Sequence, residues 1–176
     1  MQFSNPEDNV KPLGLKDGMH VADFGTGTGA YAFALAKAVG SSGRVYALDV
    51  QKDLLTRLKK EAEAKDVHQL EVMWCDLDTL GGTKLADASL DAAVIANVLF
   101  QSEHKQHFLR EVWRVLKPGA RVLFIDWSSS FAGMGPHPSQ VVTEGRAKEL
   151  LLEAGFMYKN VFPAGAHHYG LLYIRP

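Results

Sequence analysis

The stretch Val21-Ala22-Asp23-Phe24-Gly25-Thr26-Gly27-Thr28-Gly29 places three glycines at alternate positions directly behind a short apolar segment that includes a carboxylate. The apolar segment predicts a buried strand. The alternating glycines allow a sharp turn and let a ligand approach bare main chain. The Ala-rich segment from Ala30 predicts a helix, and the first N–H groups of a helix are free to bind a ligand. The stretch therefore predicts a strand, a binding loop and a helix.

Asp23 is the unusual residue of this stretch. A carboxylate at the tip of a buried strand costs free energy unless a cation or a hydrogen-bond donor meets it. We therefore expect a ligand that carries an amine beside Asp23.

The glycines alone are compatible with a dinucleotide. Gly25 to Ala30 satisfies the pattern G-x-G-x-x-A, and Asp49 follows the next predicted strand, where an acid holds ribose hydroxyls. This alternative predicts an NAD(P)-dependent oxidoreductase. Asp23 disfavours it, because a carboxylate beneath a pyrophosphate would repel the negative charge of the ligand.

Counted from Asp23, the pattern D-x-G-x-G-x-G resembles the first motif of the class I S-adenosylmethionine-dependent methyltransferases. In that family the leading acid faces the amino-acid end of the cofactor. The resemblance runs from about Gly18 to the C-terminus. It implies S-adenosylmethionine as the cofactor, and it implies that the following loop residues contact it: Asp23, Gly25, Thr26, Gly27 and Gly29.

Three later segments extend the resemblance. The predicted strand 44–49 ends in Asp49, which matches the ribose position, and the strand 70–74 leads into Asp76, which matches the position that receives the adenine amino group. Val50 and Leu77, the residues that follow these acids, are also expected to contact the cofactor. The apolar run 90–99 contains Asn97 at the tip nearest the transferred methyl group, which implies both cofactor contact and a catalytic role. Each acid alone could equally be a helix cap, and Asn97 a turn residue. Their order and spacing favour the cofactor site.

Strands and helices alternate along the chain, which predicts an α/β fold with a doubly wound, mostly parallel sheet. The expected helices are 30–39, 53–65, 102–116 and 139–154, and residues 5–15 are expected to form a short helix or an arm over the cofactor. The segments 156–162 and 168–174, separated by Pro163-Ala164-Gly165, predict a hairpin. The resemblance implies seven strands with an antiparallel C-terminal strand, in a Rossmann-like methyltransferase fold.

The sequence offers few candidates for a catalytic base. His137 ranks first, because its loop, stiffened by Pro136 and Pro138, follows the fifth predicted strand and should lie at the ligand-binding edge of the sheet. His104 and His107 share a helix face, but no third ligand is placed by the sequence, so no metal site is predicted.

Composition narrows the class of protein. At 176 residues and 47% hydrophobic, the chain predicts one domain over residues 1–176. The net charge of −1 and the scattered basic residues give no indication of a nucleic-acid partner. The single cysteine is typical of a reducing compartment and excludes multi-cysteine capture of a metal or of arsenic. No apolar run predicts a membrane span, and a cytoplasmic location is expected.

These patterns predict a cytoplasmic S-adenosylmethionine-dependent methyltransferase that acts on a small-molecule acceptor. The motifs are similar to those of the quinone-biosynthesis methyltransferases, without implying a quinone substrate. Two alternatives stay open, an NAD(P)-dependent oxidoreductase and a non-catalytic subunit that binds S-adenosylmethionine. The sequence offers little material to cover the site, so a homo-oligomer or a partner subunit could complete it.

Overall fold

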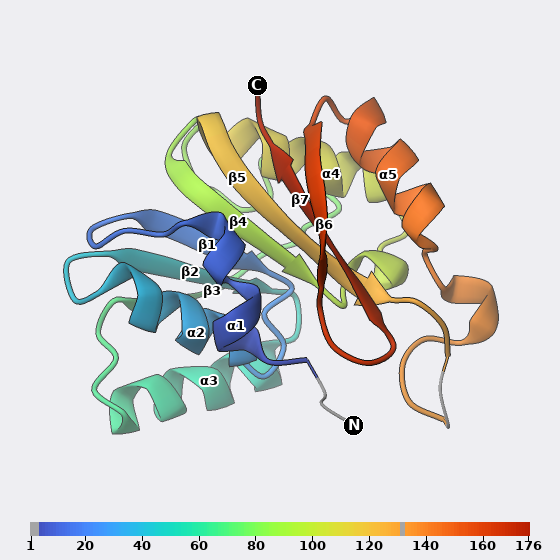
Figure 1. The fold of residues 1–176 in the computed structure, drawn as a ribbon. Helices are drawn as coiled ribbons and strands as arrows, with labels where there is room; N and C mark the ends of the chain where they lie inside the picture. The colour runs from blue at the N-terminus through green and yellow to red at the C-terminus, as the bar shows by residue number, and fades with distance from the viewer. Residues whose placement is uncertain (1–3, 131–132) are drawn as a thin grey trace.

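The computed structural model describes residues 4–130 and 133–176, and its strands form a seven-stranded sheet in the order β3-β2-β1-β4-β5-β7-β6 (Figure 1). The strands are β1 (His20–Phe24), β2 (Arg44–Asp49), β3 (Leu70–Trp74), β4 (Leu90–Ala96), β5 (Leu116–Trp127), β6 (Met157–Pro163) and β7 (His168–Ile174). The first five pair in parallel, and β7 is antiparallel to both β5 and β6. The predicted mostly parallel sheet with an antiparallel C-terminal strand is confirmed.

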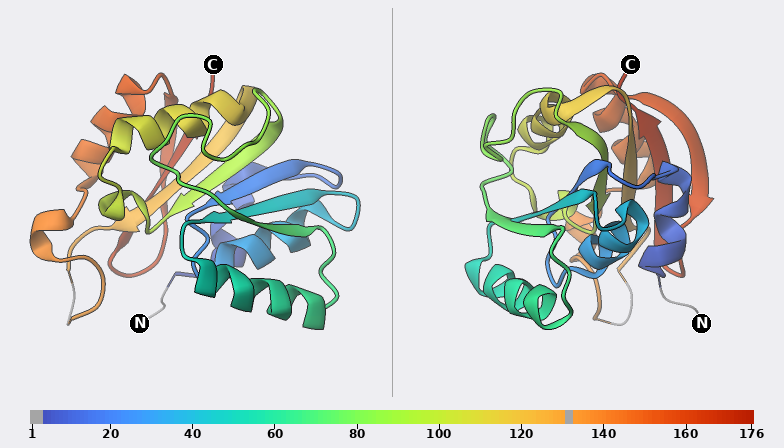
Figure 2. Two further views of the ribbon diagram at one scale, coloured as in Figure 1. Left: turned by 180° about the vertical axis from the view of Figure 1, so that it is seen from behind. Right: turned by 90° about the vertical axis from the view of Figure 1, so that its left-hand side faces the viewer.

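Helices cover both faces of the sheet (Figure 2). They are α1 (Pro6–Asn9), α2 (Ala30–Val39), α3 (Lys52–Ala64), α4 (Lys105–Val115) and α5 (Glu144–Glu153), with short 3₁₀ turns η1 (Lys11–Leu13), η2 (Leu99–Gln101) and η3 (Pro138–Gln140). One apolar core joins α1, α2 and α3 to the sheet, and a second core joins α4 and α5 to the opposite face. The central parallel strands β1 and β4 are buried on both sides and therefore read as continuous apolar runs, whereas the edge strand β3 is partly exposed.

Two helices are shorter than the sequence predicts. The expected helix 102–116 begins only at Lys105, and Leu116 already belongs to β5. The expected helix 139–154 is divided into η3 and α5, which begins at Glu144 because the Thr143 hydroxyl accepts a hydrogen bond from the Arg146 amide. Residues 141–143, between η3 and α5, are not helical, and there Tyr169 donates a hydrogen bond to the Val142 carbonyl at 2.7 Å. Local patterns gave no sign of that tertiary contact.

Residues 5–15 contain the expected short helix, but none of them lines the cleft at the carboxyl edge of the sheet. Helix α1 packs against α2, turn η1 packs against β5, and Val10 and Leu13 join the core on that face of the sheet. Buried Asn9 donates hydrogen bonds to the Tyr31 hydroxyl, at 2.9 Å, and to the Ala164 carbonyl, at 3.3 Å. The segment thus ties α2 to the turn between β6 and β7.

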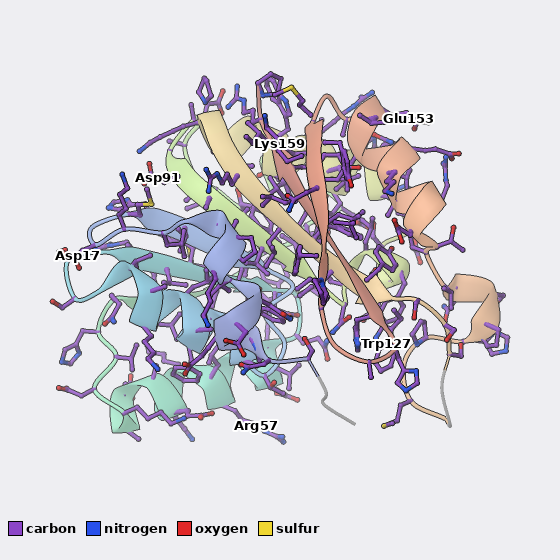
Figure 3. The ribbon with its side chains drawn as sticks, in the orientation of Figure 1. Asp17, Arg57, Asp91, Trp127, Glu153 and Lys159 are labelled. Atoms are coloured by element: carbon purple, nitrogen blue, oxygen red, sulfur yellow. The ribbon has the colours of Figure 1, made fainter. Side chains whose placement is uncertain are left out.

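Charged side chains lie mainly on the outside of the molecule. Arg57 of α3, Glu153 of α5 and Lys159 of β6 are exposed (Figure 3). In the part of the chain that the structure describes, no helix is long and apolar enough to cross a membrane.

Candidate functional site

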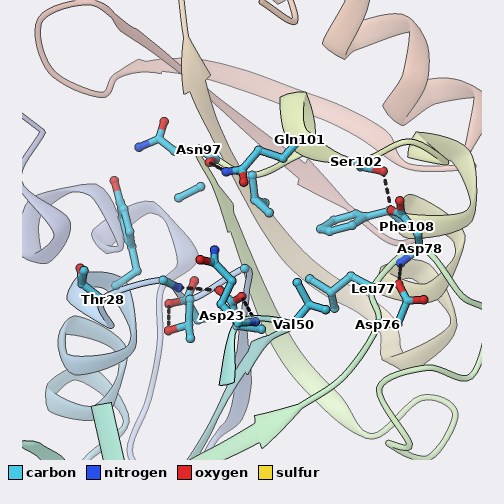
Figure 4. Close-up of a pocket in the computed structure, with 18 of the residues that line it drawn as sticks. Asp23, Thr28, Val50, Asp76, Leu77, Asp78, Asn97, Gln101, Ser102 and Phe108 are labelled. Atoms are coloured by element: carbon cyan, nitrogen blue, oxygen red, sulfur yellow. Dashed lines mark hydrogen bonds between the residues drawn. The ribbon is translucent and has the colours of Figure 1, made fainter. Parts of the chain in front are cut away.

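A cleft of about 350 Å³ lies at the carboxyl ends of β1, β2 and β4, beside the loop that follows β3 (Figure 4). This volume falls within the usual range for small-molecule sites. The parallel strands deliver their ends to one edge, so residues that are far apart in sequence meet there. Of the predicted site residues, the cleft is lined by Asp23, Gly25, Thr26, Gly27, Asp49, Val50, Asp76, Leu77 and Asn97. Gly29 closes the loop behind it as the N-cap of α2.

The glycine loop is held in a conformation that side chains would obstruct. The amides of Gly25 and Thr26 both donate to the Leu48 carbonyl, at 2.8 and 2.9 Å. Gly25 has a φ of +78°, and a Cβ there would overlap the side chain of Val98. At Gly27, by contrast, an added Cβ would meet no atom within 4 Å. The loop therefore presents bare main chain to open space, as a cofactor cradle requires.

Asp23 is a buried carboxyl at the bottom of the cleft. Only 2% of the residue is exposed, and its Oδ2 accepts a hydrogen bond of 2.7 Å from the Thr26 hydroxyl. Burial raises the pKa of Asp23 to about 7, and the bond from Thr26 lowers it only in part. A cationic group of a ligand would restore the ionised form, so the site fits an amine.

Asp49 is engaged with the main chain of two loops. Its Oδ2 accepts from the Gly27 amide and its Oδ1 from the Gln51 amide, both at 2.9 Å. The next residue, Val50, lines the cleft with 56% of its surface exposed. A flat apolar ligand group would cover Val50, and Asp49 holds the loops on either side of it in place.

Asp76 and Leu77 shape the opposite end of the cleft. Asp76 accepts from the Asp78 amide and the Thr79 hydroxyl, each at 3.0 Å, and its side chain is exposed. Leu77 is 9% exposed and contributes to the core below the cleft. This end offers polar atoms at the rim and an apolar floor.

Asn97 follows β4 and has a φ of +56°, a conformation that Asn tolerates better than most residues. Its backbone amide donates to the Ile125 carbonyl at 2.9 Å. Its buried Oδ1 has no hydrogen-bond partner among the described residues. An unsatisfied buried oxygen costs free energy, so a ligand that donates a hydrogen bond there would be stabilised. The glycine cradle, exposed Val50 and this oxygen all fit S-adenosylmethionine.

The structure does not bring His137 to the cleft. The side chain is exposed, and its Nδ1 lies 2.8 Å from the Ser139 hydroxyl and accepts from the Ser139 amide, so it caps η3. His104 and His107 lie with ring centroids 5.4 Å apart. Within residues 4–130 and 133–176, no group of three or more metal-binding side chains converges on a point.

The sequence predicts residues 100–107 as part of the acceptor wall, and Gln101 and Ser102 of that segment do line the cleft. Three other lining residues are not predicted from the sequence: Tyr31, in the first turn of α2, Asp78, in the loop after β3, and Phe108, in α4. The position of Tyr31 just behind the glycine loop was an available signal. Asp78 and Phe108 reach the cleft by contacts between distant segments, for which the sequence contains no local pattern.

Comparisons with known proteins agree with this geometry. A profile of the family described as "Methyltransferase domain" matches residues 15–162. A structure described as a SAM-dependent methyltransferase from Aquifex aeolicus is 31% identical, with a TM-score of 0.90, and the match covers 99% of this chain and 91% of that one. The demethylmenaquinone methyltransferase of Bacillus cereus is 30% identical over 122 residues, and the match covers 69% of this chain and 50% of that protein.

The arsenite methyltransferase of Aquipseudomonas alcaligenes is 34% identical over 116 residues, and the match covers 64% of this chain and 34% of that protein. The chain thus spans about a third to a half of the length of these curated relatives. It belongs to the methyltransferase domain family, with the fold and cofactor class of the class I S-adenosylmethionine-dependent enzymes. The dinucleotide interpretation of the glycine loop is not supported.

Proposed function

We propose that this chain transfers the methyl group of S-adenosylmethionine to a small organic acceptor, and that residues 1–176 act as one domain. The observation that carries the proposal is the cleft, where a buried acid, a bare glycine loop and Asn97 surround one space. Family membership supports the same cofactor.

The cofactor supplies an electrophilic methyl group on a sulfonium, and the chain's own residues bind and orient the reactants. Asp23 would meet the amino group and Asp49 the ribose, and Val50, Asp76 and Leu77 would meet the adenine. Asn97 would lie nearest the methyl group, where its free Oδ1 can accept a hydrogen bond from the acceptor. Holding the acceptor in line with the breaking bond and excluding water account for much of such a rate enhancement.

The cysteine content favours an organic acceptor over arsenite. Arsenite capture requires several thiolates, whereas Cys75 is the single cysteine of the sequence. It is buried, and burial, with a contribution from Asp49, raises the pKa of its thiol to about 12. The thiol therefore stays protonated and unreactive at neutral pH. This composition also supports the cytoplasm as the proposed location.

The proposal is tested in two stages. Calorimetry and thermal shift with S-adenosylmethionine, S-adenosylhomocysteine, NAD and NADP should show binding of the two adenosyl ligands only, because a ligand that binds the folded state stabilises it. Transfer of a labelled methyl group to a panel of hydroxylated aromatic compounds, with arsenite as a negative control, should then yield an organic product. Binding of a dinucleotide alone would contradict the proposal.

A second candidate is a cofactor-binding subunit without chemistry of its own. It is favoured by the cleft lining, which contains no His, Lys or Cys among the described residues. In that case the adenosyl ligands would bind, but methyl transfer would require an added partner chain. The role of His137 as a catalytic base stays a prediction. If His137 only caps η3, the His137→Ala variant should transfer methyl groups at an unchanged rate.

A further inference from the structure

Asp78 lies where two loops meet at the mouth of the cleft (Figure 4). It belongs to the connection between β3 and β4, which contains no helix or strand over residues 75–89. A long irregular connection has many conformations in the unfolded chain and needs specific contacts to order it. One such contact is the carboxylate of Asp78.

The two oxygens of Asp78 bind the loop that follows β4. Oδ1 accepts from the Ser102 hydroxyl at 2.5 Å, and Oδ2 accepts from the amides of Glu103 and His104 at 2.9 and 3.2 Å. Partial burial raises the pKa of Asp78, but the hydrogen bonds from these three residues outweigh it and hold the pKa below its usual value. The carboxylate is therefore ionised at neutral pH, and its bonds are charge-assisted.

Helix α4 lacks a side-chain cap from its own N-cap residue. His104 is that residue, and its side chain makes no capping hydrogen bond. Asp78 accepts from the backbone amide of His104 and from that of Glu103, the residue before it. The carboxylate thus satisfies the N-cap amide and lies near the positive end of the helix dipole.

The contact joins two segments that line one binding site. Asp76, Leu77 and Asp78 belong to the connection after β3, and Val98, Gln101 and Ser102 belong to the segment after β4. We propose that Asp78 is a positioning residue that fixes these two segments relative to each other and so pre-organises the half of the cleft that takes the adenine. The inference rests on the proposed function, since it assigns adenine to this half. A pre-organised site binds more tightly because less ordering accompanies binding.

The test measures binding of S-adenosylhomocysteine and of adenosine by calorimetry, below the unfolding transition. Asp78→Ala should weaken both ligands by a similar factor of about ten or more, because both contain the adenine and the loss of a charged acceptor costs at least one such factor. Asp78→Asn keeps an amide oxygen for the backbone amides and should recover part of the affinity.

The matched control is Asp87→Ala. Asp87 belongs to the same connection, is exposed, and pairs with Arg114 away from the cleft, so its removal should leave both affinities unchanged. Equal losses in Asp78→Ala and Asp87→Ala would mean a general loss of order and would overturn the inference. So would unchanged adenosine affinity in Asp78→Ala.

If Asp78→Ala does not fold, Ser102→Ala is the substitute, because it removes one of the three hydrogen bonds. It should weaken the binding of adenosine by about threefold, which corresponds to roughly half the free energy of a tenfold loss. Unchanged affinity in that variant would also overturn the inference. Failure of the wild-type protein to bind either ligand would instead refute the proposed function itself.

Discussion

At the scale of single residues, three acids of the cleft have different surroundings and should respond differently to change. Asp23 is buried with one hydroxyl donor, Asp49 is bound by two main-chain amides, and Asp76 forms a turn at the exposed rim. The same residue type is therefore a buried carboxyl with a raised pKa at Asp23, a link between two loops at Asp49 and an exposed acceptor at Asp76. The sequence showed the three acids but not these differences.

Replacing Asp49 by Ala should weaken binding of S-adenosylhomocysteine at least about tenfold, because it removes a charged acceptor and frees the amides of Gly27 and Gln51. The domain should stay folded by circular dichroism. Asp53→Ala, an exposed acid in the first turn of α3, is the control and should bind normally. Normal affinity in folded Asp49→Ala would remove Asp49 from the cofactor site.

Cofactor binding should depend on pH through Asp23. Its pKa is about 7 in the free protein, and a bound cation would favour the ionised form. The affinity for S-adenosylmethionine should therefore rise roughly tenfold between pH 6 and pH 7.5, with release of a proton. Calorimetry in buffers of different ionisation enthalpy measures both effects. The Asp23→Asn variant should bind S-adenosylmethionine weakly, with an affinity that does not change with pH. An affinity of the wild-type protein that does not change with pH would contradict the role of Asp23 in binding the amino group.

At the scale of elements, tertiary contacts decided where the helices begin. Apolar periodicity continued through residues 139–143, but residues 141–143 are not helical, Tyr169 donates a hydrogen bond to the Val142 carbonyl, and α5 begins behind Thr143. Helix α4 likewise begins at Lys105, and the amide of its N-cap residue His104 donates to Asp78 of another loop. The N-terminus of α5 is thus capped by a neighbouring residue, whereas that of α4 is capped by a residue distant in the sequence.

Thr143→Ala should lower the free energy of unfolding by about 1 kcal/mol, because it removes the side-chain acceptor at the N-terminus of α5. Ser139→Ala is the matched control at the position where the sequence placed the helix start, and Ser139 is exposed. It should change stability little. Urea denaturation of both variants checks this, and equal losses would indicate that the helix extends to Ser139.

At the scale of the whole molecule, two buried carboxyls lower the stability at neutral pH. They are Asp23 of β1 and Asp126 of β5, on the two strands that flank β4. Burial raises the pKa values of Asp23 and Asp126 to about 7. Glu111 behaves in the opposite way. Burial raises its pKa, but hydrogen bonds from Arg114 and Thr83 outweigh burial and lower the pKa to about 2.

As far as these three carboxyls decide it, the ligand-free protein should therefore be most stable near pH 4. Neutral Asp23 and Asp126 contribute to the free energy of unfolding in full below pH 3.8. This contribution is lost as the pH rises through 7, by on the order of 2–4 kcal/mol for each carboxyl. Ionised Glu111 contributes to the free energy of unfolding in full above pH 4.5, and this contribution is lost as the pH falls toward 2. Urea midpoints should fall from pH 5 to pH 8, and less steeply in Asp126→Asn. A midpoint that rises over this range would contradict the assignment.

The sequence by itself determined the sheet, the glycine loop and the acids at the strand ends. These features depend on local chemistry, since apolar runs specify buried strands and glycines permit the turn at Gly25. Parallel strands then bring their carboxyl ends to one edge whatever the details of the loops. For this reason Asp23, Asp49, Asp76 and Asn97 could be placed together from order and spacing.

Only the tertiary structure decided which polar groups satisfy one another. It placed His137 outside the cleft, directed Asp78 to the start of α4 and brought Tyr31 to the lining. Hydrogen bonds between distant loops depend on how the chain packs as a whole. The physical reason is that an acceptor is chosen by proximity in space, which periodicity and local propensity do not encode.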